Sequence, residues 1–218
     1  MKIANINLIP SKKALVAAVA AFAAGVPLMA SAESNFIGPA PANAAATARL
    51  DVQITVPRIL FLQVGTGTAS ANNTTIDLVT FTPTSAQIAA GTAGIAAATN
   101  GVRAAQLIGN GGTINLTATT TGPLNTGVVG ENISWSQIAA ATSLPGFPHP
   151  ALVDGPAAGA ASAYGSAAAK VTNLSANWTF TFNAPATPPA AGTYGGAGAA
   201  SPGAGLNGGR IVYTATMP

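Results

Sequence analysis

The sequence predicts an all-β protein, an antiparallel β-sandwich of the immunoglobulin or pilin type with about eight strands. Short runs in which apolar and polar residues alternate recur along the chain, and 25 Gly and 16 Pro residues punctuate it. Charged residues make up only 6% of the chain, whereas Thr, Ala and Gly are abundant. This composition is typical of β-structure joined by many turns. We therefore expect long Ala/Gly/Pro-rich loops and at most one short helix.

The first 32 residues have the order of features found in a secretory signal peptide. Three lysines precede an uncharged apolar run at 14–26, and small residues follow at Ala30-Ser31-Ala32. The apolar run is shorter than the roughly 20 residues that cross a bilayer. We expect cleavage after Ala32, secretion, and no membrane-spanning segment in the mature chain.

The charge balance changes once residues 1–32 are set aside. The formal net charge of +3 equals the three lysines of this segment, so residues 33–218 carry five basic and five acidic residues. A neutral chain lacks the basic patch that nucleic-acid binding requires, and it favours self-association. With no Cys and one His, we expect no disulfide, no metal site and no cofactor.

The mature chain starts with an expected flexible leader at 33–47, followed by a single β-sandwich domain at 48–218. The first predicted strand has four aliphatic residues on one face, alternating with polar residues on the other. These candidate strand-pairing residues are Leu50, Val52, Ile54 and Val56. Period-two alternation places them on one side of an extended chain.

Further strands follow in chain order, separated by turn signals. The expected strands are 59–64, 76–82, 102–108, 113–121, 133–138, 174–182 and 210–217. Asn110-Gly-Gly112 predicts a hairpin between two of them. Residues 85–91 are either a short helix or a loop, and 143–169 is expected to be a long exposed excursion.

The residues that could carry catalysis are few. His149 is the single imidazole, and it lies between two prolines, where a loop role is the simpler interpretation. No Gly-x-Ser-x-Gly elbow marks a nucleophilic serine. Glu131 and Asp154 could pair for glycoside hydrolysis, but only five acidic residues remain in the mature chain. We expect no catalytic residue and no enzymatic activity.

Two tryptophans leave an alternative open. Trp135 and Trp178 could stack on sugars if they lie on an exposed face, which would indicate a secreted carbohydrate-binding or adhesin module. Trp178 shares a predicted strand face with Phe180 and Phe182, however, and this favours a place in the core.

The two ends of the mature domain resemble a known class of protein. Residues 54–62 (ITVPRILFL), 191–195 (AGTYG) and 211–216 (IVYTAT) carry the likeness. They resemble small secreted bacterial β-sandwich surface proteins, above all cysteine-free fimbrial subunits of the chaperone–usher class, with WxL-like and spore-coat-like domains as relatives in style.

The resemblance implies a fimbria-like structural subunit that passes through the periplasm, with a possible periplasmic chaperone, and reaches the cell surface. It also implies a sandwich that lacks a strand, completed by the N-terminal strand of the next copy. Whether residues 50–56 are donated in this way or pair within their own domain stays open at this point.

Overall fold

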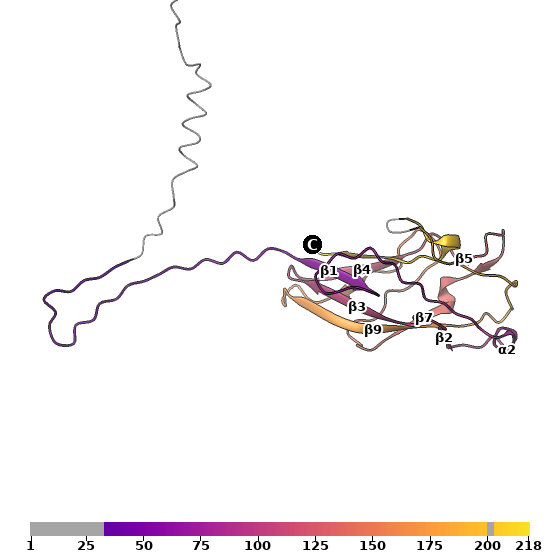
Figure 1. Cartoon of the computed structure of the whole chain (residues 1–218), viewed down its shortest axis with the longest axis horizontal. Helices are drawn as coiled ribbons and strands as arrows, with labels where there is room; N and C mark the ends of the chain where they lie inside the picture. Colours follow the sequence, from indigo (N-terminus) through magenta and orange to yellow (C-terminus); the bar gives the residue numbers. More distant parts are fainter. Residues whose placement is uncertain (1–32, 200–202) are drawn as a thin grey trace, which may run out of the picture. The chain divides into compact units, whose positions relative to one another are not determined.

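The computed structural model describes residues 33–199 and 203–218, so the expected signal peptide lies outside the described residues. The chain divides into two units, Met1–Val56 and Pro57–Pro218. In the described part of the chain, ten strands form antiparallel sheets in the second unit (Figure 1). The predicted all-β, antiparallel class is confirmed.

The largest sheet is organised around one long strand, β9 (Thr172–Phe182). Both edges of this strand have partners, and β1 extends the sheet beyond β3. Its other members are β1 (Leu60–Val64), β2 (Ile95–Ala96), β3 (Val102–Gly109) and β7 (Ile138–Thr142). The register places Leu107 of β3 opposite Leu62 on one side and opposite Leu174 on the other.

Two smaller sheets contain the remaining strands. A three-stranded sheet has the order β10 (Val212–Thr216), β4 (Ile114–Thr119), β8 (Ser162–Tyr164), and a two-stranded sheet pairs β5 (Leu124–Asn125) with β6 (Asn132–Ile133). Strand β10 pairs with β4 on one side and forms an edge of its sheet.

The first two sheets contribute to one apolar core. Ala105, Leu107, Ala176, Trp178 and Phe180 come from the large sheet, and Ile114, Leu116 and Tyr164 from the three-stranded sheet. Burying each large side chain contributes about 1.5–3 kcal/mol. The apolar face predicted for 174–182 is confirmed, since its members from Ala176 to Phe182 are buried and the residues between them are not.

The predicted hairpin at Asn110-Gly-Gly112 is wrong. Strand β3 pairs with β1 and β9, while β4 pairs with β10 and β8, so this turn carries the chain from one sheet to the other. Both strands still point their apolar residues into the same core, which is why the alternation on each side looked like that of a hairpin. The Asn110 side chain is used elsewhere, as described below.

Three further segments refine the expectations. The helix at 85–91 forms as α2 (Ser85–Ala89), capped by Thr84 in a reciprocal capping box with Gln87. The strand expected at 133–138 is interrupted by the 3₁₀ helix η1 (Trp135–Gln137), because Ser134 caps a turn there. A second 3₁₀ helix, η2 (Leu206–Gly208), precedes β10.

Candidate strand-pairing segment and acceptor groove

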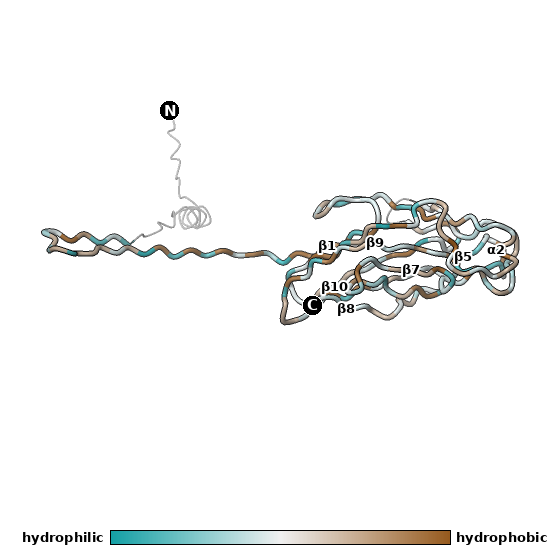
Figure 2. Tube along the Cα trace, turned by 90° about the horizontal axis from the view of Figure 1, so that it is seen from below, coloured by the Kyte–Doolittle hydropathy of each residue, from teal (hydrophilic) through white to brown (hydrophobic). Residues whose placement is uncertain are grey.

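The strand-pairing segment, residues 49–56, is fully exposed in the first unit. Its four aliphatic side chains are 72–81% exposed, and none of the strand pairings among the described residues involves them. The segment is the trace that leads into β1 in Figure 1, and Figure 2 shows its alternating hydropathy. The sequence therefore produces an amphipathic extended chain that has an apolar face and no core to bury it.

The chain is fixed immediately after this segment. The Asn110 side chain accepts a hydrogen bond from the Ile59 backbone N–H (2.8 Å) and donates one to the Pro57 carbonyl (2.8 Å). Arg58 between them donates to the Pro218 carbonyl. Residues 57–59 are thus tied to the turn after β3 and to the C-terminal end of β10. Sequence reasoning missed this clamp because it assigned Asn110 to a hairpin.

An apolar groove of about 1410 Å³ lies in the second unit. Its lining includes Leu78 and Phe81 on one wall, Ile211 and Tyr213 at the β10 side, and Phe182 of β9. Ligand and peptide sites are typically concave and mostly apolar. The groove is therefore a candidate binding site for an apolar partner.

One wall of the groove is the segment at 74–82, where the sequence predicts a strand. The alternation is present, since Val79 and Phe81 pack on the core and Ile76 and Leu78 are half-exposed. Among the described residues, however, Thr80 is the single member that exchanges backbone hydrogen bonds, with Thr99 and Ala98. This wall is a chain without backbone hydrogen-bond partners along most of its length. The lining also includes residues 188–199 and Tyr213 of β10, an edge strand.

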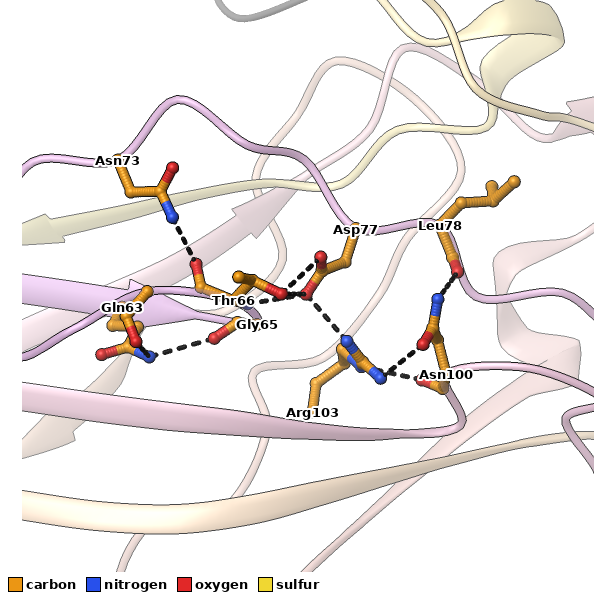
Figure 3. A network of polar contacts seen from close by, with 9 residues as sticks. Gln63, Gly65, Thr66, Asn73, Asp77, Leu78, Asn100 and Arg103 are labelled. Atoms are coloured by element: carbon orange, nitrogen blue, oxygen red, sulfur yellow. Dashed lines mark hydrogen bonds and ion pairs between the residues drawn. The ribbon is translucent and has the colours of Figure 1, made fainter.

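A polar network holds this wall in place (Figure 3). The Asp77 carboxylate accepts hydrogen bonds from the Thr66 backbone N–H (2.6 Å) and hydroxyl (2.8 Å), and from Arg103 of β3 (2.8 Å). Arg103 also donates to the Asn100 carbonyl and side chain, and Asn100 donates to the Leu78 carbonyl. Segment 74–82 is therefore pinned mainly by side chains.

The ionisation of Asp77 reflects this network. Burial alone would raise the pKa of this carboxyl group, but the hydrogen bonds from Arg103 and Thr66 outweigh it and hold the pKa below the usual 3.8. The ion pair stays charged well into the acidic range, so the groove wall is stable against mild acidification.

Both tryptophans lie in the interior. Trp178 is fully buried and donates its indole N–H to the Phe147 carbonyl, while Trp135 is buried and donates to the Gly122 carbonyl. A sugar-stacking platform requires an exposed ring face. Neither residue provides one in this structure.

The groups considered for catalysis have other partners. His149 contacts the Pro150 carbonyl and the Tyr213 hydroxyl, rather than a serine and a carboxylate. Asp154 accepts from the Trp135 backbone N–H, and Glu131 accepts from the Thr126 hydroxyl. Each of these side chains is used in hydrogen bonds to other parts of the structure.

The described residues offer little that suggests another kind of site. Residues 33–199 and 203–218 contain no cluster of three His, Asp or Glu side chains suited to a metal ion. In the same residues, every helix is too short or too polar to cross a membrane. Comparison with protein-family models, with curated proteins and with solved structures finds no match for this chain.

Proposed function

We propose that this protein is an exported, non-enzymatic structural subunit of a cell-surface fibre or matrix, whose copies join by β-strand pairing. The observation that carries the proposal is the strand-pairing segment. Four large aliphatic side chains at alternate positions, each more than 70% exposed, form an apolar strip along one face of the segment. Contiguous exposed apolar surface of this kind marks an interaction site.

The occupant we propose for the groove is the strand-pairing segment of a second copy. An inserted strand could form backbone hydrogen bonds with the unpaired edges that flank the groove, 74–82 and β10. Its alternate side chains, Leu50 to Val56, would fill the apolar floor. Strand addition works in this way generally, since the backbone supplies affinity and alternate side chains supply specificity.

The clamp at 57–59 argues against pairing of the segment with its own β1. For the segment to pair back along its own β1, the chain would have to reverse at residues 57–59, and a tight hairpin turn needs its own backbone geometry there. Asn110 instead binds Pro57 and Ile59 on both sides of Arg58. Reversal would break these hydrogen bonds.

The remaining parts of the proposal follow from the sequence. The expected signal peptide would route the chain through the periplasm to the cell surface or the extracellular space. A periplasmic chaperone could cover the apolar strip or the groove before assembly, as the resemblance to fimbrial subunits implies. The carbohydrate-binding alternative depended on exposed tryptophans, and the burial of Trp135 and Trp178 leaves it without a supporting observation.

Two neighbouring substitutions test the proposal with a matched control. Ile54→Asp places a charge on the apolar face of the segment, and Thr55→Asp places the same charge on the opposite face. We would measure the size of the chain from residue 33 onward by light scattering, with electron microscopy of the same samples. Ile54→Asp should abolish oligomers and filaments, whereas Thr55→Asp should leave them.

Two results would overturn strand donation. One is equal assembly by both variants. The other is a wild-type chain that stays monomeric at high concentration and fails to bind an added peptide of residues 48–57 when its own segment is deleted.

A further inference from the structure

The motif Phe147-Pro-His-Pro150 inserts two residues into the core, although the sequence places it in an excursion expected to be exposed; His149 is partly buried and Pro148 is exposed. Phe147 and Pro150 are fully buried. The Phe147 ring packs edge-to-face on Tyr164 at 5.0 Å and against Trp178 at 5.3 Å. Residues 147–150, the plug, therefore anchor the N-terminal part of the excursion at 143–169 in the core shared by the five-stranded and three-stranded sheets.

Carbonyl groups of the plug are bound by side chains of the surrounding strands. The Phe147 carbonyl accepts from the Trp178 indole N–H (3.1 Å) and from the Thr142 hydroxyl (2.9 Å). The Pro148 carbonyl accepts from the Tyr164 hydroxyl (2.5 Å). The plug is thus held by hydrogen bonds from β7, β8 and β9.

His149 provides the link to β10. Its Nδ1 atom lies 2.5 Å from the Pro150 carbonyl oxygen, which can only accept a hydrogen bond, so Nδ1 must carry the proton. In the neutral ring Nε2 is then an acceptor, and the Tyr213 hydroxyl, 2.7 Å away, donates to it. The hydrogen bonds thus select one tautomer of a neutral imidazole.

Three aromatic rings pack against His149. The ring lies edge-to-face with Trp178 (4.7 Å between centroids) and Phe180 (5.2 Å) of β9, and with Tyr213 (5.4 Å) of β10. The one titratable partner bonded to it is Tyr213, whose pKa burial raises far above the acidic range. Tyr164, bonded to the adjacent Pro148 carbonyl, also has its pKa raised by burial. Among the described residues, no carboxylate is hydrogen-bonded to His149.

We propose that the plug is an acid-released latch: protonation of His149 withdraws residues 147–150 from the core and breaks their link to Tyr213 of β10. A protonated ring would turn Nε2 into a donor that faces the Tyr213 hydroxyl. The tyrosine proton would then lose its acceptor, and the partly buried imidazolium would have no hydrogen-bonded carboxylate among the described residues. The latch acts within a single folded chain, so its test needs no assembly, although Tyr213 also lines the groove.

The pKa gives the direction and the pH range. Burial lowers the pKa of His149 to about 4, although the Pro150 carbonyl opposes this shift, whereas a released, solvated His has a pKa near 6.5. The released form therefore binds the proton more tightly, and opening becomes easier as the pH falls from about 6.5 to about 4. Between pH 7 and pH 3, the linkage relation gives an increase in the opening equilibrium on the order of 200-fold.

The single His makes the test direct in an untagged protein. The imidazole proton resonance in an NMR titration should report a pKa near 4. Hydrogen exchange of the 143–169 peptides, corrected for intrinsic rates, should rise on the order of 200-fold from pH 7 to pH 3. His149→Gln cannot titrate but keeps every carboxylate, so its excess exchange at low pH should vanish.

A second variant keeps the proposal testable if His149→Gln does not fold. Tyr213→Phe removes the donor that stabilises neutral His149, so the His149 pKa and the opening midpoint should both move to higher pH. A wild-type His149 pKa near 6.5 would mean that the aromatic rings accommodate the imidazolium, and this would overturn the proposal. Identical acid opening of wild type and His149→Gln would also overturn it, because it would assign the effect to carboxylates.

Discussion

Strand β9 and the strand-pairing segment share one sequence pattern and have opposite environments. Both alternate large apolar residues with polar ones, but β9 is paired on both edges and buries its apolar face, whereas residues 49–56 are unpaired and expose theirs. Alternation therefore specifies an extended chain with one apolar face. Whether that face is buried depends on whether another part of the protein packs against it. Segment 74–82 lies between these extremes, half-buried and pinned by side chains.

The largest expected effect on stability distinguishes the buried apolar face of β9 from the exposed apolar face of the strand-pairing segment. Trp178→Ala should lower the free energy of unfolding by about 3–5 kcal/mol, because it opens a cavity in the core. Ile54→Ala should change it by less than about 0.5 kcal/mol in dilute monomer, since the side chain is exposed. Urea denaturation measures both values. A large cost for Ile54→Ala would show that the segment packs within its own chain, contrary to the proposed function.

An intermediate effect is expected at the groove wall. Asp77→Asn should lower the free energy of unfolding by about 2 kcal/mol, because it leaves the largely buried Arg103 without its counter-ion. Asp51→Asn makes the same chemical change on the exposed segment and should cost less than about 0.5 kcal/mol. Thermal or urea unfolding at pH 7 compares the pair. Equal effects would mean that side chains do not pin segment 74–82.

The smallest effect is expected where the strand-pairing segment joins β1. Asn110→Ala removes both hydrogen bonds of the clamp and should cost about 1 kcal/mol. Hydrogen exchange at Ile59 should increase, while exchange in the centre of β9 should not. Unchanged exchange at Ile59 would show that the clamp is dispensable and would weaken the argument against intrachain pairing.

The sequence predicts most of the regular strands because their alternation is local information. Strands β4, β9 and β10 lie where apolar residues recur with period two, while β1 lies in a nearly continuous apolar run. The pairing of β3 and β4 was predicted wrongly, because a turn sequence such as Asn110-Gly-Gly cannot specify whether the chain returns to the same sheet or crosses to another.

The groove and the plug are harder to predict from the sequence than the strands, for the same reason. The apolar face of residues 50–56 is visible in the pattern, but the groove is lined by segments that are far apart in sequence, among them 74–82, 188–199 and Tyr213. The plug was missed because Phe147 and His149 stand among prolines and small residues without any periodicity. Their burial depends on Tyr164, Trp178 and Tyr213, which are distant in sequence.

The groove and the strip proposed to fill it are both apolar, and residues 33–218 are neutral. Association through such surfaces has a distinct thermodynamic behaviour. Salt screens charge–charge attraction, so raising the ionic strength should not dissolve fibres joined in this way, and strongly hydrated anions such as sulfate should strengthen them. Hydrophobic stabilisation weakens on cooling, so the same fibres should loosen in the cold.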